Sequence, residues 1–161
     1  MEPLIINLDA FNVVGVSFIA NLQEIEEGKL GKKAFESMKE RVDEVVGRSS
    51  DSIYLIQIYP MKPNFNPHVD RFTQIIGYAV SASVVSEAPL DMIRHTVPAN
   101  RYVRSTHIGL ESELGRTYEF LYGKYIGQLG THPIGYDFEL WDSRYKPESS
   151  DNEIDVHIAI A

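Results

Sequence analysis

The sequence predicts an α+β fold: a tandem βαββ duplication that forms one antiparallel sheet, with two helices on one face and a ligand cleft on the other. Strand and helix patterns follow in the order β-α-β-β, and the same order then repeats. Leu30-Gly31 and Leu114-Gly115 each open a predicted helix, and IYLIQIYP in the first half aligns with GYDFELWD in the second. We therefore expect a single domain over residues 1–161, with pseudo-repeats at about residues 1–86 and 87–161.

In the first half, residues 11–18 (FNVVGVSF) are rich in valine and phenylalanine and predict a strand. Apolar residues recur at spacings of three and four between Leu30 and Val46, which predicts an amphipathic helix. Residues 47–52 break the helix, and residues 53–59 (IYLIQIY) predict the next strand. A proline-rich loop over residues 60–70 then leads to a predicted strand at residues 72–80.

The second half repeats this layout. Residues 92–107 predict a strand interrupted at Pro98, with residues 101–107 as its stronger part. Residues 114–129 carry leucine, isoleucine and tyrosine at helical spacing, and residues 130–133 end that helix. Residues 136–141 (YDFELW) predict a strand, residues 142–152 a polar loop, and residues 154–160 (IDVHIAI) a closing strand.

Strand alternation assigns side chains to the two faces of the predicted sheet. We expect the apolar sets to pack under the helices, namely Tyr136, Phe138, Leu140, Ile154, Val156, Ile158 and Ile160. We expect the opposite face to carry Leu55, Gln57, Tyr59, Asp137, Glu139, Trp141, Asp155 and His157. That second face mixes carboxylates with large aromatic rings, which an open sheet face does not require.

Composition narrows the range of functions. The chain has 161 residues, no cysteine, and 15 Lys+Arg against 23 Asp+Glu, a formal net charge of −8. An acidic chain is poorly suited to direct nucleic-acid binding and favours a cationic ligand. Without cysteine there is no disulfide, no thiolate catalysis and no cysteine-based zinc site. The sequence has no signal peptide or apolar run long enough to cross a bilayer, so we expect a cytoplasmic protein that does not bind membranes.

Motifs for catalysis are missing from the sequence. It contains no GxSxG, no glycine-rich phosphate loop and no HExxH, and its five histidines lack metal-ligand spacing. We therefore expect no cofactor and no metal, and we assign no catalytic residue. The notable candidate is Glu139, with two interpretations: a solvent-facing glutamate on a sheet, or a glutamate recessed among aromatic rings where the halves meet. In the second case its charge is costly unless a cation pairs with it, and nearby rings add cation–π attraction.

Segments 107–130 (HIGLESELGRTYEFLYGKYIGQLG), 136–141 (YDFELW) and 152–160 (NEIDVHIAI), together with the tandem βαββ layout, resemble the GyrI-like family of bacterial effector-binding domains. These domains also occur in AraC-type and MerR-type multidrug regulators. The resemblance implies that Glu139 meets cationic, lipophilic ligands in an aromatic pocket. By similar position it makes Trp141, Tyr78, Tyr102 and Tyr59 candidate pocket walls. Gln57, at the position equivalent to Glu139 in the other half, is the remaining candidate binding residue.

We therefore expect a stand-alone effector-binding protein for small organic cations or amphiphiles, with a role in transcription regulation or in multidrug or toxin sensing. The resemblance leaves two alternatives open. One is a hydrolase of strained genotoxic molecules that uses the same glutamate, with its pKa raised by burial. The other is a protein-partner module similar to gyrase inhibitors. Exposed sheet edges would also permit a homodimer.

Overall fold

The computed structural model describes residues 2–84 and 87–161, and the strands of these residues form one eight-stranded antiparallel sheet. Its order is β1-β6-β8-β7-β3-β4-β2-β5. The strands are β1 (Leu4–Leu8), β2 (Phe11–Ala20), β3 (Arg48–Ile58), β4 (Phe72–Val80), β5 (Ile93–Val97), β6 (Asn100–Ile108), β7 (Pro133–Trp141) and β8 (Glu153–Ile160). This confirms the predicted α+β class and the antiparallel sheet.

Each half contributes a helical segment between its second and third strands. The first consists of α1 (Leu22–Gly28) and α2 (Leu30–Glu40), separated by Lys29 in the left-handed conformation. Asn21 and Glu24 form a capping box at the start of α1, which satisfies backbone donors there. The second runs from α3 (Leu114–Phe120) through a π-helical turn (Leu121–Tyr125) into α4 (Ile126–Gln128). Short 3₁₀ turns lie at Val42–Glu44 and Glu111–Glu113.

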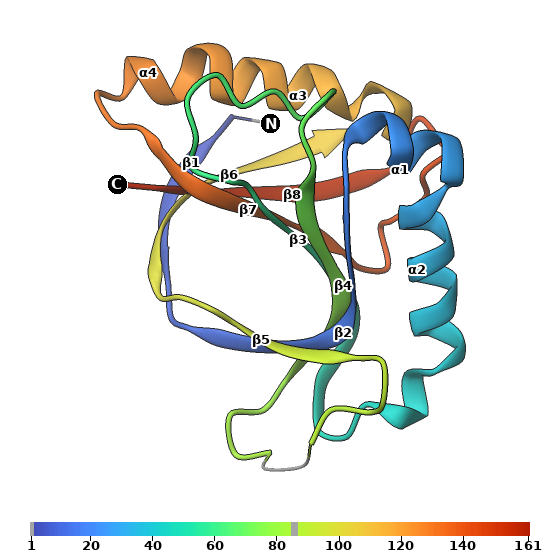
Figure 1. Cartoon of the computed structure of the whole chain (residues 1–161). Helices are drawn as coiled ribbons and strands as arrows, with labels where there is room; N and C mark the ends of the chain where they lie inside the picture. The colour runs from blue at the N-terminus through green and yellow to red at the C-terminus, as the bar shows by residue number, and fades with distance from the viewer. Residues whose placement is uncertain (1, 85–86) are drawn as a thin grey trace.

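The sheet curls until its two ends meet (Figure 1). β1 pairs with β6 and β2 pairs with β5, and the register does not slip between these two ladders: Leu8 lies opposite Asn100, and Phe11 lies opposite Val97. The segments 4–20 and 93–108 therefore act as two long, bent strands that pair through their bends. This pairing closes the curl and leaves only short free strand edges.

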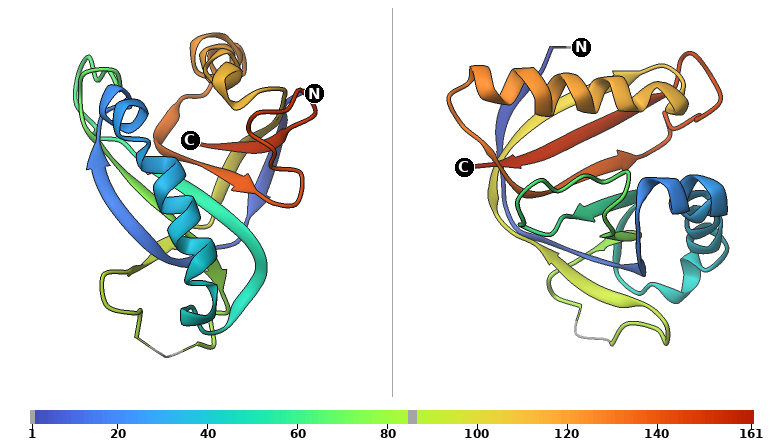
Figure 2. Two further views of the ribbon diagram at one scale, coloured as in Figure 1. Left: turned by 90° about the vertical axis from the view of Figure 1, so that its right-hand side faces the viewer. Right: turned by 45° about the horizontal axis from the view of Figure 1, so that its top comes forward.

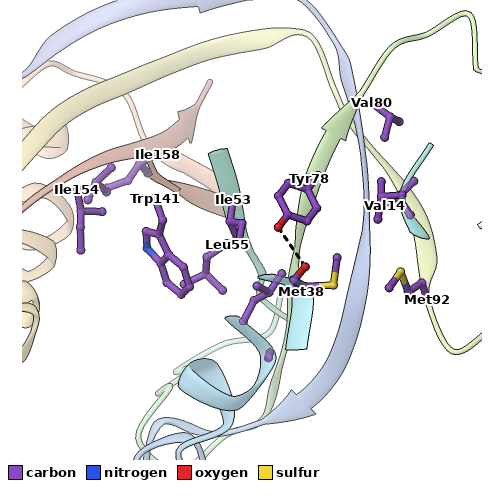
Figure 3. Close-up of a cluster of buried hydrophobic side chains, with 14 of the residues drawn as sticks. Val14, Met38, Ile53, Leu55, Tyr78, Val80, Met92, Trp141, Ile154 and Ile158 are labelled. Atoms are coloured by element: carbon purple, nitrogen blue, oxygen red, sulfur yellow. Dashed lines mark hydrogen bonds between the residues drawn. The ribbon is translucent and has the colours of Figure 1, made fainter. Parts of the chain in front are cut away.

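Both helical segments pack on the outer face of the curled sheet. One buried cluster there joins Ala34 and Met38 of α2, Leu121 and Ile126 of the second segment, and strand residues that include Leu55, Trp141, Val156 and Ile158. Figure 3 shows part of this cluster, with Tyr78 beside Met38 under α2. The inner face holds a second cluster, which no helix touches: Val13, Ile56, Ile75, Val97, Tyr102, Phe138 and Ala159. The two helical segments stand apart on the outer face, and strands β3 and β7 run between them (Figure 2).

The strand order is symmetric about the β3–β7 pair. If each strand of the first half (β1–β4) is exchanged with its counterpart in the second half (β5–β8), the strand order becomes the same list read backwards. Three of the seven strand pairings between described residues join the halves: β1–β6, β2–β5 and β3–β7. The first strand of each half thus pairs with the other half, as a duplication with exchanged outer strands would produce. The boundary between residues 86 and 87 stays a prediction.

The face assignment made from alternation is wrong for β7 and for Leu55, Gln57 and Tyr59, which were expected on the face away from the helices but lie on the helix-covered face. The carboxylate-bearing face, where the ligand cleft was expected, is therefore the helix-covered one. Glu139 lies opposite Leu55 and Val156, and partners across a ladder share a face, so Glu139 points toward the helices. Tyr136 and Phe138 point to the inner face, together with Asp155 and His157. The prediction that Ile154, Val156, Ile158 and Ile160 pack under the helices is confirmed. Apolar character could not separate the two faces of β7 because the curled sheet buries both of them.

Several elements differ from the sequence-based expectation. The helix expected from Leu30 to Val46 ends at Glu40 and is followed by a 3₁₀ turn, and β3 begins at Arg48, inside the segment expected to be a break. The sequence did not predict β1 or α1, and the interrupted strand over residues 92–107 is two strands separated by Pro98 and Ala99. Among the described residues, no helix combines the length and apolar character that crossing a membrane requires.

Candidate functional site

Strand β7 places two carboxylates side by side on the outer face of the sheet, between the helical segments. Asp137 and Glu139 alternate with the inward-pointing Phe138, and their exposed fractions are 0% and 3%. Across β3, Gln57 lies opposite Asp137, and Leu55 lies opposite Glu139. Both acids are therefore removed from water at the junction of the two halves.

Glu139 has two neutral donors. The Tyr118 hydroxyl donates to Oε2 at 2.6 Å, and the Trp141 indole N–H donates to Oε1 at 3.0 Å. Burial raises the pKa of Glu139 from 4.5 to about 8, although both hydrogen bonds act in the opposite direction. Its carboxyl group is therefore mainly protonated at neutral pH in the absence of a ligand.

Asp137 has three neutral donors. Gln57 Nε2 donates to Oδ1 at 2.8 Å, and the hydroxyls of Tyr59 and Tyr122 donate to Oδ2 at 2.7 and 2.6 Å. Burial raises the pKa of Asp137 from 3.8 to about 6, and the three hydrogen bonds limit that rise. Asp137 is therefore the more readily ionised of the two acids.

A chain of hydrogen bonds links the two carboxylates. Gln57 Nε2 lies 2.8 Å from Asp137 Oδ1 and 3.2 Å from the Tyr118 hydroxyl, which in turn donates to Glu139. Gln74 Nε2 donates to Gln57 Oε1 at 2.9 Å, but Gln74 Oε1 is buried and lacks a partner among the described residues. One polar network thus spans β4, β3, β7 and α3, and it ends in an unused acceptor.

Aromatic rings surround the carboxylates. Trp141 stacks on Tyr145 with a centroid distance of 4.7 Å and an interplanar angle of 8°, and Phe35 from α2 meets both rings edge-on. Tyr118 and Tyr122 lie nearly parallel, with centroids 6.2 Å apart. On a third side are Tyr59, Phe65 and Phe72. Such walls suit flat or bulky apolar ligands, and their faces attract cations.

No ion pair formed by the described residues includes Asp137 or Glu139. The charged neighbour that acts on Glu139, besides Asp137, is another acid: Glu111, which accepts a hydrogen bond from Tyr145 and raises the pKa of Glu139 further. The described residues also contain no group of three or more His, Asp or Glu side chains placed to hold a metal ion. A cation that enters this site would therefore meet negative charge without competition from lysine or arginine.

The site is closed in this structure. The tyrosines over the carboxylates, Tyr118 and Tyr122, are themselves half-buried, so part of each residue remains accessible to solvent. An open groove of about 430 Å³ lies elsewhere, between α3 and β6, and its lining includes none of the residues above. Access to Glu139 therefore requires movement of the covering side chains.

The structure brings together four of the six candidate binding residues: Glu139, Trp141, Gln57 and Tyr59. Tyr78 shares the outer face but lies under α2, where its hydroxyl donates to the Met38 carbonyl at 3.1 Å (Figure 3). Tyr102 lies on the inner face, where it packs against Tyr136 and Phe138. The predicted wall roles of these two tyrosines rest on the resemblance alone.

Sequence reasoning did not name four members of the network as candidate binding residues: Asp137, Tyr118, Tyr122 and Gln74. A signal existed for three of them. Asp137 stands two positions before Glu139, so it shares the same strand face, and Tyr118 and Tyr122 are four apart, so they share a helix face. No such signal exists for Gln74, because its place depends on the β3–β4 register.

The comparisons with known proteins agree with this architecture. The family model described as a GyrI-like small molecule binding domain matches residues 1–161. The transcriptional regulator BrlR of Pseudomonas aeruginosa is 26% identical over 162 residues, which cover 99% of this chain and 56% of BrlR. This chain thus spans about half the length of that relative.

Solved structures share the fold. The structure of SAV2435 bound to tetraphenylphosphonium has a TM-score of 0.69 and 15% identity, covering 100% of this chain and 94% of the other. A hydrolase from Listeria innocua has a TM-score of 0.59 and 11% identity, covering 99% of this chain and 92% of the other.

Proposed function

Because the chain belongs to the GyrI-like small-molecule-binding family, we propose that it binds small lipophilic organic cations at Glu139. The carboxylate supplies the charge, and the rings of Trp141, Tyr145, Tyr118 and Tyr122 supply apolar and cation–π contact. Such binding would serve in the sensing of toxic cations or in transcription regulation, the role named for BrlR.

One observation carries this proposal: two fully buried carboxylates share a site with neutral donors and no cationic side chain of the described residues. Burying an ionised carboxylate without a partner costs several kcal/mol in a protein interior. Without a ligand Glu139 avoids that cost by holding a proton. An organic cation stabilises the ionised form instead, so we expect the carboxyl group to lose its proton when the ligand binds. That SAV2435 is bound to tetraphenylphosphonium supports the same ligand chemistry.

A ligand that enters the site must first displace the side chains that cover the two acids. Tyr118 and Tyr122 are half-buried and cover the two acids, and the Tyr118 hydroxyl is the group that a cation would replace at Glu139. When they rotate away, the rings keep apolar surface in contact with the ligand. Among the described residues, the donors to the two acids are hydroxyl, indole and amide groups without charge, which suits ligands of varied shape.

Calorimetric titration with tetraphenylphosphonium at pH 8.5 tests the proposal. We expect Glu139→Gln to weaken binding about tenfold or more, because the ligand charge then lies in a dry site without its partner. Glu119→Gln is the matched control, since Glu119 is exposed on α3 and the change removes the same charge. Equal affinities of the Glu139→Gln variant and the unchanged protein would remove Glu139 from the binding role.

A second candidate function is hydrolysis of strained genotoxic molecules. The difference between the pKa values of the two acids supports it. Burial raises the pKa of Glu139 to about 8, so Glu139 can donate a proton, while Asp137, whose pKa is about 6, can accept one from water. Incubation with a panel of strained electrophiles, followed by mass spectrometry, tests it. Addition of water with repeated turnover, lost in the Glu139→Gln variant, would favour the enzyme over the binding protein.

A further inference from the structure

The site holds one more carboxylate than a singly charged ligand requires. Asp137 and Glu139 are two residues apart on one strand face, which places their backbone positions about 7 Å from each other. Both side chains reach the same side of the sheet, and Gln57 and Tyr118 bridge them. A monocation that pairs with Glu139 leaves Asp137 as a second buried acid.

Asp137 has the surroundings of a resident anion. Its three donors, Gln57, Tyr59 and Tyr122, stabilise the ionised form, whereas Glu139 has two donors. None of the three donors carries a charge, so they satisfy the oxygen atoms of Asp137 without neutralising it. The site therefore offers a second place for positive charge at Asp137.

A separate observation points to a missing ligand in the same network. Gln74 is 4% exposed, and its Oε1 is a buried acceptor without a partner among the described residues. Buried acceptors in native proteins are nearly always satisfied. Because Gln74 Nε2 is already used on Gln57, whose own Nε2 contacts both Asp137 and Tyr118, the free oxygen leaves an unused acceptor beside the part of the network that the two acids share.

We propose that the ligands of this site include dications, in which two positive groups about 7 Å apart pair with Glu139 and Asp137. The inference rests on the proposed function, because Glu139 keeps its role as one of the two anions. The stacked pair of Trp141 and Tyr145 and the nearly parallel pair of Tyr118 and Tyr122 favour a flat aromatic spacer between the charges.

Two ligands of similar size but different charge test the proposal: N-methyl-phenylpyridinium, a monocation, and dimethyl-bipyridinium, a dication of two linked rings. We expect Asp137→Asn to weaken binding of the dication about tenfold or more and to change binding of the monocation less than about threefold. Glu139→Gln should weaken binding of both ligands, and the exposed control Glu119→Gln should affect neither. Circular dichroism and thermal unfolding check that each variant folds.

A second measurement needs no variant. Calorimetry at pH 6 in two buffers with different ionisation enthalpies counts the protons released on binding. Ionisation of both acids is required for the dication but of only one for the monocation, so the dication should release at least about half a proton more. Asp137, Glu139 and Glu111 are the acids that face this site, and Tyr59, Tyr118 and Tyr122 stay neutral because burial raises their pKa values.

The outcomes separate the two proposals. If Asp137→Asn weakens both ligands equally, or if both ligands release the same number of protons, Asp137 only positions the tyrosines and the inference is overturned, while monocation binding at Glu139 stands. If neither ligand nor tetraphenylphosphonium binds the unchanged protein, the proposed function fails and the inference fails with it.

Discussion

The carboxyl group of Glu139 illustrates how burial sets the properties of a single residue. Two hydrogen bonds satisfy its oxygen atoms, yet its pKa rises to about 8 because loss of water is the larger effect. The folded protein therefore binds a proton at neutral pH that the unfolded chain releases.

Glu139 should make the ligand-free protein less stable as the pH rises from 6.5 to 8.5. In this window the folded state holds the proton of Glu139 and the unfolded state does not, so the unfolding free energy falls by about 2 kcal/mol. His157, with a pKa lowered by burial from 6.5 to about 4, acts in the opposite direction, mostly below this window, and adds back only about 0.4 kcal/mol within it. Asp137 acts at lower pH, below about 6.

Urea unfolding at pH 6.5 and 8.5 measures this fall. In Glu139→Gln it should largely disappear, because glutamine is neutral throughout, whereas the exposed control Glu119→Gln should retain it. A fall of the same size in Glu139→Gln would contradict the assignment to Glu139.

Among the site residues, strand alternation correctly grouped Glu139, Trp141, Gln57 and Tyr59 on one face. The direction of that face and the burial of Asp137 depend on which side the helices cover. Tyr102, which only the family resemblance made a candidate wall, lies on the inner face, away from Glu139. The apolar pattern of its strand could not have indicated this, because the strand is buried on both faces.

At the scale of elements, the second helical segment forms the cover of the site. Helical periodicity predicted a helix over residues 114–129, and the structure has one from Leu114 to Gln128. The π-helical turn at Leu121–Tyr125 was not predicted, because the i to i+5 bonding leaves no pattern in residue types. Its interior glycines weaken this helix relative to alanine.

Replacing Gly123 and Gly127 by alanine should stabilise the protein. An added Cβ meets no atom within 4 Å at either position, and both residues lie in helical backbone. We expect about 1 kcal/mol for each substitution, seen as an increase in the unfolding free energy in urea. Gly130→Ala is the matched control: Gly130 has φ +74°, so alanine should destabilise there despite the open space. Equal effects at all three positions would contradict this.

At the scale of the whole molecule, the bent strand pairs bind the halves to each other. β1 completes the sheet beside β6 of the second half, and β5 completes it beside β2 of the first. The β3–β7 ladder, which carries the site residues, is also shared. Neither half therefore satisfies its own strand edges or buries its own core.

Fragments 1–86 and 87–161 should each be largely unfolded alone and should assemble when mixed. Three strand pairings form only between the halves, so each fragment alone leaves them open. Circular dichroism of the separate and mixed fragments measures this, and tryptophan fluorescence reports on Trp141 in the second fragment. A cooperative thermal transition in either isolated fragment would contradict the prediction and mark that half as an independent unit.

The sequence by itself determined the order of most elements, the α+β class and the clustering of Glu139 with aromatic residues, because periodicity and composition are local properties. It could not determine which face the helices cover, how the segments 4–20 and 93–108 close the sheet, or that Asp137 joins Glu139 in one buried network. Those features depend on strand register and on contacts between residues distant in the chain, so only the tertiary structure fixes them. The cost of burying a carboxylate, in particular, depends on which side chains from other elements cover it.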